Sequence, residues 1–395
     1  MAQRTFDSRL TSTSGPLSRH LARPSLKRRR GVVAIGAACC ALFASALANL
    51  APTPTLALEQ QPDADSLRLD QVQVLGTHNS YHVAPDEVAA GLIRAFAPQE
   101  AEANDYSHRP LVEQLDRLRV RQFELDLFLD PDGGRYSQPM AMKLARERRV
   151  EVPPHDPDGL LAKPGIKILH SPDVEFRTTV YSLADSLRML KKWSDEHPGH
   201  FPVFLLLELK SESFSPFIRP PKWDWEACQR LEREVLEQLP RERLLVPDDV
   251  RGDAATLRDA VAGRGWPTVR AARGKFVLLL DNEDSVRAAY LKPSDTLAGR
   301  LLFVSVDRRH PAAAWMKRND PIGSAAEITS LVRDGFLVRT RADAGTVEAR
   351  KGDVRRRDQA LATGAQLIST DFPEPDPRWP GYSVTWPDGR EFRRR

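Results

Sequence analysis

Eight short apolar runs, separated by polar or amphipathic segments, constrain the fold of this 395-residue chain more than any other feature. Amphipathic segments with helical spacing lie between several of them, at residues 110–119, 183–193 and 224–239. Alternating strands and helices are typical of a parallel sheet covered by helices, so the pattern predicts an α/β protein with a TIM-type (β/α)8 barrel, regular or distorted. A doubly wound open sheet is the alternative, although no dinucleotide-type glycine loop favours it. The eight runs lie at residues 72–77, 122–129, 166–170, 202–209, 275–281, 301–306, 336–341 and 366–371.

The composition of the first 50 residues differs from that of the rest. Residues 1–30 hold eight Lys or Arg and one acid, residues 31–50 are apolar and uncharged, and small residues at positions 44–48 offer cleavage sites. This order is typical of an export signal, although 20 apolar residues also suffice for an uncleaved membrane anchor. We predict a signal peptide at 1–50, a linker at 51–66, a catalytic barrel at 67–375 and a tail at 376–395. The mature protein is then exported, to the periplasm or the extracellular space.

The net charge of +4 is due to this leader. Without it, 50 basic and 53 acidic residues remain, and a chain so close to neutral has no excess positive charge for nucleic acid. Two of the three cysteines lie in the leader, so the exported chain has no internal disulfide. Cys228 lies on the apolar face of a predicted helix and is expected to be a buried packing residue.

Three carboxylates lie in apolar strands. Glu124 and Asp126 alternate with leucines, so strand geometry places both on one face and directs them into the barrel. Glu208 ends the continuous apolar run 203–209, where a buried charge needs a partner. Taken alone, Glu208 favours a salt bridge with Lys210 or an arginine. With the amide oxygen of Asn79, however, the three acids form an all-oxygen set that suits one Ca²⁺ ion and leaves positions open for phosphate and water.

Two histidines also follow apolar runs. His78 lies in Gly76-Thr77-His78-Asn79-Ser80, and His170 ends the run 166–170. Phosphodiester cleavage requires one proton to be removed from the attacking hydroxyl and another to be given to the leaving oxygen, and histidine does either near neutral pH. A single histidine at a strand end is more often structural. Two of them, together with three acids, predict acid–base catalysis beside a metal ion.

At these residues the sequence resembles the calcium-dependent phosphatidylinositol-specific phospholipase C family, in its secreted, single-domain bacterial branch. The resemblance is carried by four motifs over residues 70–210, and it implies catalytic roles for His78 and His170 and calcium-ligand roles for Asn79, Glu124, Asp126 and Glu208. By the resemblance, His170 protonates the leaving oxygen, His78 stabilises the phosphate or acts as base, and Glu124 is also a candidate to share the role of base. The motifs are Thr77-His78-Asn79-Ser80-Tyr81, Glu124-Leu125-Asp126, Ile168-Leu169-His170 and Leu207-Glu208-Leu209.

The resemblance also implies a reaction. The inositol 2-hydroxyl of phosphatidylinositol attacks the neighbouring phosphorus, and diacylglycerol leaves a cyclic inositol phosphate behind. One alternative is a barrel phosphodiesterase of the glycerophosphodiester or sphingomyelinase D type, and Thr370-Asp371-Phe372-Pro373 resembles the final strand of the glycerophosphodiester group. The other is a non-catalytic exported lipid-binding barrel.

Further charged and apolar residues are candidates for contact with the substrate and the membrane. Lys210, Asp281, Arg339 and Arg341 lie at or just past predicted strand ends, where a barrel keeps its site, although solvated charges there are equally common. Phe214, Phe217 and Trp223 either contact a membrane surface or pack over the barrel rim. The expected partners are thus a phospholipid substrate and, transiently, its membrane, with no protein partner implied.

Overall fold

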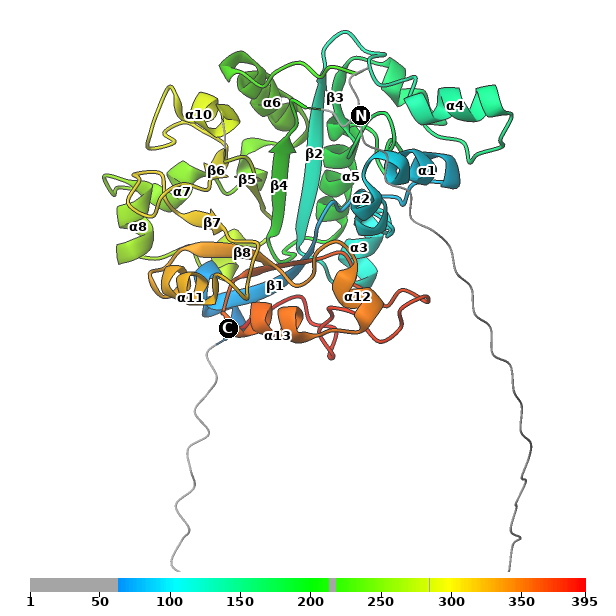
Figure 1. Cartoon of the computed structure of the whole chain (residues 1–395). Helices are drawn as coiled ribbons and strands as arrows, with labels where there is room; N and C mark the ends of the chain where they lie inside the picture. Colours follow the sequence, from blue (N-terminus) through cyan, green and yellow to red (C-terminus); the bar gives the residue numbers. More distant parts are fainter. Residues whose placement is uncertain (1–62, 213–217, 284) are drawn as a thin grey trace, which may run out of the picture. The chain divides into compact units, whose positions relative to one another are not determined.

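The computed structural model describes residues 63–212, 218–283 and 285–395, and these form one compact unit (Figure 1). Eight parallel strands form the barrel in the order β6-β5-β4-β2-β1-β9-β8-β7, and a single bridge between Ser305 and Trp315 joins the two outer strands. The predicted barrel is therefore confirmed, nearly closed rather than regular. Its strands are β1 Val72–Thr77, β2 Gln122–Asp130, β4 Val203–Leu209, β5 Phe276–Leu280, β6 Leu302–Val304, β7 Trp315–Lys317, β8 Leu337–Arg341 and β9 Leu367–Thr370.

One of the eight predicted strands is not a barrel strand. β3 (Gly165–Ile168) pairs antiparallel with the end of β2, so it runs back along its neighbour (Figure 1). The remaining barrel strand is β7, which has only three residues; the short apolar run 312–316 that leads into it was not among the eight runs predicted to be strands. The prediction therefore had the right number of strands with one wrong member.

Helices cover the outside of the barrel. In α5, Leu183, Leu187 and Leu190 form the predicted buried stripe, and Cys228 of α6 is fully buried as expected. The helices of the described residues are α1 Glu87–Phe96, α2 Pro98–Ala103, α3 Leu111–Arg117, α4 Met140–Arg148, α5 Leu183–Glu196, α6 Trp225–Gln238, α7 Pro247–Arg251, α8 Leu257–Gly263, α9 Val269–Ala272, α10 Ser285–Leu291, α11 Ala325–Arg333, α12 Val347–Lys351 and α13 Arg355–Ala362. None of these helices is long and apolar enough to cross a membrane.

The C-terminal residues pack on the barrel. β10 (Arg393–Arg394) pairs antiparallel with the start of β1, and Tyr382, Val384 and Trp386 are buried. Glu391 forms an ion pair with the guanidinium of Arg121, which is 1% exposed at the start of β2. This segment thereby covers the amino-terminal end of the two strands that carry most of the predicted site. The predicted signal peptide lies outside the described residues, as does the linker up to residue 62.

Candidate active site and metal centre

The three predicted acidic ligands meet inside the barrel. Asp126 of β2 is the direct cross-strand neighbour of Glu208 of β4, and Glu124 lies two residues before Asp126 on the same face. One carboxylate oxygen from each of the three residues lies within 4.8 Å of the others. Glu124 and Asp126 are buried, whereas Glu208 is half-buried. The alternation along β2 therefore gave the right orientation for both acids.

The electrostatics of this cluster fit a divalent cation. Burial, together with the charge of Asp126, raises the pKa of Glu124 to about 8 and that of Glu208 to about 7. Neither carboxylate oxygen of Asp126 has a hydrogen-bond partner in the described part of the chain. The Lys210 ammonium, 3.1 Å from Glu208 and 3.3 Å from Asp126, is a single charge among several acids. A bound divalent ion would coordinate the Asp126 oxygens, which lack hydrogen bonds, and would remove the repulsion among the acids.

Asn79, the fourth predicted ligand, directly follows His78 in the loop after β1. Its backbone is left-handed (φ 43°), a conformation that asparagine tolerates better than most residues. The next residue, Ser80, is anchored to β2: its amide donates to the Glu124 carbonyl at 2.9 Å, and its hydroxyl accepts from the Glu124 amide at 2.8 Å. Asn79 is buried, and its side chain makes no hydrogen bond among residues 63–212, 218–283 and 285–395, which leaves its oxygen free for a cation.

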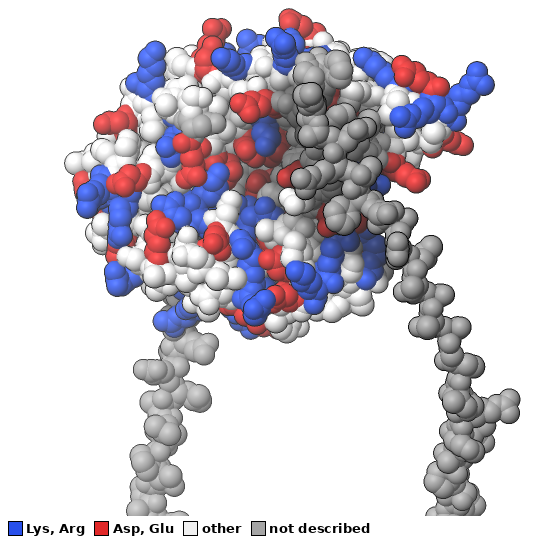
Figure 2. Space-filling view, in the orientation of Figure 1, with Lys and Arg blue, Asp and Glu red and all other residues white. Residues whose placement is uncertain are grey.

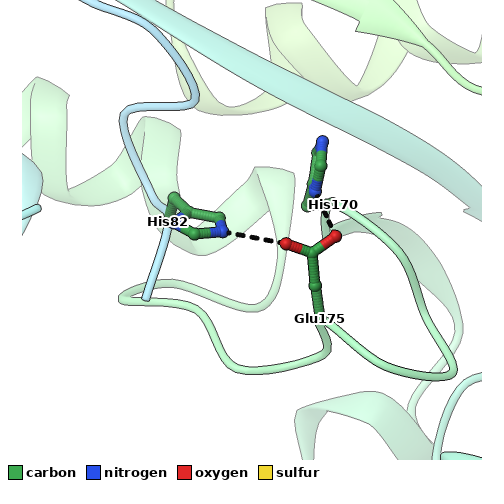
Figure 3. A group of neighbouring side chains, drawn as sticks. All are labelled: His82, His170 and Glu175. Carbon is green, nitrogen blue, oxygen red and sulfur yellow. Dashed lines mark hydrogen bonds and ion pairs between the residues drawn. The ribbon is translucent and has the colours of Figure 1, made fainter. Parts of the chain in front are cut away.

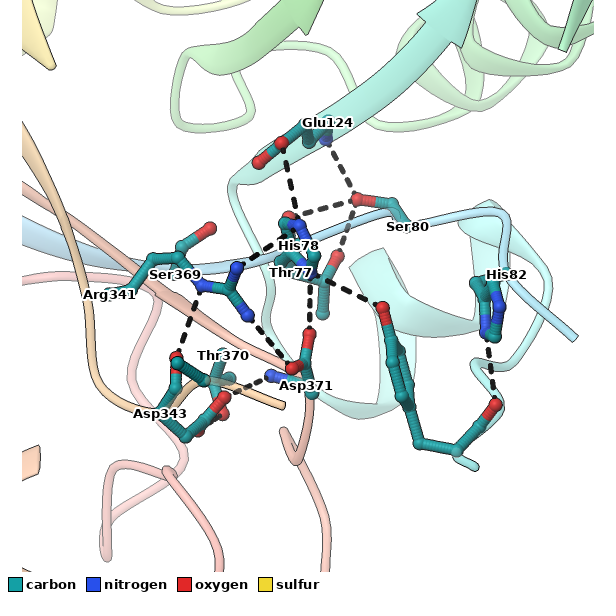
Figure 4. Close-up of polar contacts among 12 residues, drawn as sticks. Thr77, His78, Ser80, His82, Glu124, Arg341, Asp343, Ser369, Thr370 and Asp371 are labelled. Atoms are coloured by element: carbon teal, nitrogen blue, oxygen red, sulfur yellow. Dashed lines mark hydrogen bonds and ion pairs between the residues drawn. The ribbon is translucent and has the colours of Figure 1, made fainter. Parts of the chain in front are cut away.

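The contacts of the His78 ring, drawn in Figure 4, fix its tautomer. Its Nδ1 lies 2.8 Å from Asp371 Oδ1, and its Nε2 lies 3.2 Å from Nη1 of Arg341. Because arginine only donates, Nε2 must accept, and Nδ1 therefore carries the proton that is donated to Asp371. Burial and the charge of Arg341 lower the pKa of His78 to about 3, against the opposing influence of Asp371. The ring is thus neutral, with its lone pair on Nε2, 3.8 Å from Glu124 Oε1.

Asp371 is a site residue that the sequence analysis missed. It directly follows β9, and its amide donates to the buried carboxylate of Asp343 at 2.7 Å (Figure 4). Burial acts to raise the pKa of Asp371, but the charge of Arg341 and the contact with His78 hold it well below its usual range. A polar side chain at the end of an apolar strand was the feature that identified the other site residues. Asp371 has this feature, but the sequence analysis named it only within the motif Thr370-Asp371-Phe372-Pro373.

His170 reaches the site from the opposite direction to the barrel strands, because β3 runs antiparallel to β2. The amide of Leu169 donates to the Asp126 carbonyl at 3.3 Å, which sets His170 beside the acidic cluster. Its Nδ1 lies 2.7 Å from Glu175 Oε2, and the other ring nitrogen points away from this carboxylate (Figure 3). Burial alone would lower the pKa of His170, but the Glu175 carboxylate outweighs it and raises the pKa to about 9.

Glu175 also holds a third histidine that the sequence analysis did not single out. His82 Nε2 lies 3.3 Å from Glu175 Oε1, so each oxygen of this buried carboxylate faces one imidazole (Figure 3). Glu175 lies in a loop, five residues past His170, where nothing in the local pattern marks it as a partner.

The four predicted substrate-binding residues surround the same centre, but only some of their side chains are available to contact a substrate. Arg339 is 1% exposed and bonded to Glu124, and Asp281 forms an ion pair with Lys317 at 2.9 Å, so both already have charged partners. Arg341 bridges His78 and Asp371, with its side chain 14% exposed. Lys210 lines an open cavity of about 570 Å³ together with His170, Glu175 and Glu208. Acidic and basic side chains are interspersed over the face shown in Figure 2, with several acids gathered around a hollow.

Of the two alternatives for Trp223, membrane contact and packing at the barrel rim, the structure supports packing. Its side chain is 3% exposed, and its indole donates to the carbonyl of Lys210 at 3.2 Å, so it packs beneath the rim. Phe214 and Phe217 lie outside the described residues.

The chain is similar to proteins of one family, in sequence and in fold. The family model described as "Phosphoinositide phospholipase C, Ca2+-dependent" matches residues 67–395. Two crystal structures of a calcium-dependent phosphoinositol-specific phospholipase C from Pseudomonas sp., an apo form and a myo-inositol complex, share the fold with TM-scores of 0.51 and 0.52. They are 16% and 17% identical to this chain, and each alignment covers 85% of it and 97% of the Pseudomonas chain. A Ca²⁺-dependent phosphatidylinositol-specific phospholipase C from Streptomyces antibioticus is also similar, at 17% identity over 78% of this chain and 95% of its own, with a TM-score of 0.47. No curated protein sequence matches the chain.

Proposed function

The chain belongs to the Ca²⁺-dependent phosphoinositide phospholipase C family, and on this premise we propose that it cleaves phosphatidylinositol to diacylglycerol and a cyclic inositol phosphate by histidine acid–base catalysis. The observation that carries the mechanism is the difference between two histidines beside one acidic cluster. The pKa of His78 is lowered to about 3 and that of His170 is raised to about 9. Titratable groups whose environments separate their pKa values in this way are suited to serve as a base and an acid at neutral pH.

His170 is the proposed general acid. At neutral pH its ring carries two protons, one donated to Glu175 and one on Nε2. Transfer of the Nε2 proton to the glycerol oxygen lets the bond between phosphorus and that oxygen break, and diacylglycerol leaves as a neutral alcohol. Glu175 stabilises the charged ring before the transfer and holds its orientation.

His78 is the proposed general base, with Asp371 as its orienting partner. Its Nε2 lone pair accepts the proton of the inositol 2-hydroxyl as that oxygen bonds to phosphorus. Arg341 donates to this same nitrogen and therefore has to release it first. A substrate phosphate is a stronger acceptor for a guanidinium than a neutral ring, which supports a role for Arg341 in phosphate binding. Glu124, 3.8 Å from Nε2, remains a candidate to share the base role.

The family is Ca²⁺-dependent, and Asn79, Glu124, Asp126 and Glu208 are the residues that would hold one ion here. A calcium ion held by these residues would lower the pKa of a coordinated hydroxyl and neutralise charge on the phosphate. Around it, Lys210 supplies a cationic group that faces the cavity, and buried Arg339 fixes the carboxylate of Glu124. Asp281, whose carboxylate pairs with Lys317, is the remaining residue proposed for headgroup contact.

Exposed apolar side chains support transient contact with a membrane. Phe96, Ile322 and Val347 are 74%, 58% and 47% exposed. Each of them lies on the connection that follows β1, β7 or β8. These connections leave the barrel at the end that holds the site. Apolar side chains around a site for a lipid suit insertion into the interfacial region of a bilayer. Vesicle binding unchanged in a triple serine variant of these residues would remove the membrane proposal.

Export to the periplasm or the extracellular space is proposed from the sequence of residues 1–50. Mass determination of the N-terminus of the protein produced by its host checks whether this segment is cleaved.

The central test is incubation of the full chain with phosphatidylinositol vesicles, with and without a calcium chelator. Phosphorus NMR distinguishes a cyclic phosphate from an open one. We expect a cyclic inositol phosphate that disappears with the chelator and in His170→Ala. Products without diacylglycerol would favour the glycerophosphodiester or sphingomyelinase D type of reaction, and near-normal turnover of His170→Ala would exclude its role as the acid.

A further inference from the structure

A second cluster of metal-ligating side chains lies beside the acidic one. His82, His170 and Glu175 each offer a ligand atom, and these three atoms lie within 4.8 Å of one another. His82 and Glu175 are buried, and His170 is partly exposed (Figure 3). The proposed reaction uses His170 and Glu175 but gives His82 no part, although His82 faces the same carboxylate.

The His82 ring is fixed with a nitrogen directed into the cluster. Its Nδ1 lies 3.0 Å from the Tyr106 carbonyl, which can only accept, so Nδ1 carries a proton. The other ring nitrogen, Nε2, is thereby directed at Glu175 Oε1, 3.3 Å away, and it is the His82 atom that can ligate a metal. Stacking on the Tyr106 ring, with centroids 4.6 Å apart, holds the imidazole in this orientation.

The backbone of the cluster is also preorganised. The His82 amide donates to the Asn79 carbonyl at 2.8 Å, and its carbonyl accepts from the His108 amide at 2.9 Å. In the loop after β3, the Glu175 amide donates to Ser171 at 2.7 Å and the Ser171 amide donates back at 3.3 Å. Ligands held in this way lose little freedom when a metal binds.

The ligand chemistry separates this cluster from the calcium site. Two imidazole nitrogens and one carboxylate oxygen form a set that Zn²⁺ uses with a fourth position open, whereas the neighbouring set has only oxygen ligands and suits Ca²⁺. His170 and Glu175 line the open cavity of about 570 Å³, so an ion can enter from solvent. The same cavity leaves room for a water molecule as the fourth ligand.

We propose that His82, His170 and Glu175 bind a zinc ion, and that the bound ion inhibits the enzyme. Binding displaces the Nδ1 proton of His170 to solvent and replaces its hydrogen bond to Glu175 with metal ligation. The proton left on Nε2 then belongs to a metal-bound imidazole that is no longer an imidazolium, and it is a weaker acid toward the leaving oxygen. The inhibition rests on the proposed role of His170, whereas the binding does not. Because a proton is released, zinc should bind more tightly as pH rises.

The experiment uses the metal-stripped full chain at a saturating and constant Ca²⁺ concentration. Zinc binding is measured by calorimetry, and Co²⁺ is used in its place to record the visible absorption of a nitrogen-ligated site. Phosphatidylinositol cleavage is followed in parallel, with each protein referred to its own rate without zinc. The variants are His82→Gln and Glu175→Gln, and the matched control is His197→Gln, a partly exposed histidine in another part of the fold.

We expect one zinc equivalent that binds the wild type and the control alike. His82→Gln removes a direct ligand and should lower the zinc affinity at least ~100-fold, because mutating residues that only hydrogen-bond to metal ligands already lowers metal affinity about 10- to 100-fold. Glu175→Gln provides the same comparison if His82→Gln does not fold. Equal zinc affinity in all four proteins overturns the proposal, as does zinc potency that falls as Ca²⁺ is raised, because that places the ion at the calcium site. His82-dependent binding without any lipid cleavage would support the zinc site and reject the proposed function.

Discussion

Replacing Glu175 by glutamine tests the assignment of His170 as the general acid. The carboxylate is the main influence that raises the pKa of His170 from the reference value of 6.5 to about 9, while burial acts in the opposite direction. Glutamine keeps the size and can still accept a hydrogen bond from Nδ1, but it has no charge. The pKa of His170 in the variant should therefore fall to 6.5 or below, a loss of about 3.4 kcal/mol in stabilisation of the charged ring at 1.36 kcal/mol per pKa unit.

The consequence is a shift in the alkaline limb of the pH profile. At pH 8 the wild-type ring is about 90% protonated and the variant ring about 3%, so kcat/KM should be roughly 30-fold lower in Glu175→Gln from this cause alone. At pH 6 both rings are mostly protonated, and the protonation effect should shrink to less than about twofold. The sign follows from the acid role, because a general acid must hold its proton and activity is lost as pH rises through its pKa.

The assay is kcat/KM for phosphatidylinositol between pH 5 and pH 10 at saturating Ca²⁺. Glu100→Gln is the matched control, because Glu100 lines the same cavity and, within the described residues, bonds to neither His170 nor His82. The control should keep the wild-type profile. If Glu175→Gln loses activity equally at every pH, with its alkaline limb unmoved, the carboxylate has only a structural role and the reasoning fails.

Three further predictions concern the base, the metal and the fold. Asp371→Asn should lower kcat about 10²- to 10⁴-fold, because an amide that donates to Nδ1 would place the proton of His78 on Nε2; near-normal kcat would reject the base assignment. Glu208→Gln should raise the Ca²⁺ concentration for half-maximal activity about tenfold or more, since calcium affinity follows the number of charged ligands, and an unchanged calcium dependence would contradict the ligand set. Glu391→Gln should destabilise the fold by about 2 kcal/mol in denaturant unfolding, because it leaves the buried charge of Arg121 without its partner, whereas an unchanged midpoint would show that water reaches this guanidinium.

The barrel and the acidic cluster were accessible from the sequence because both depend on local patterns. Period-two alternation fixes which face of a strand a side chain occupies, and the carboxyl ends of parallel strands meet at one edge. Glu124, Asp126 and Glu208 therefore converge as the pattern along β2 and β4 predicts. The same reasoning identified His78 and His170 as neighbours of this cluster, although it could not give their protonation.

The partners of the two histidines depended on tertiary structure. Asp371 lies 293 residues from His78, and Glu175 lies in a loop with no periodic pattern. Two further features were also decided there: β3 turned back along β2, and the short strand β7 took its place in the barrel. A sequence pattern indicates on which face of its helix or strand a residue lies, but not which charged residue from a distant part of the chain it contacts. The pKa of each histidine is set by that distant charge and by burial. The sequence therefore indicated the acidic cluster and both histidines, with His170 as the acid by resemblance, and only the fold supplied the partners Asp371 and Glu175 that suit one ring to be the base and the other the acid.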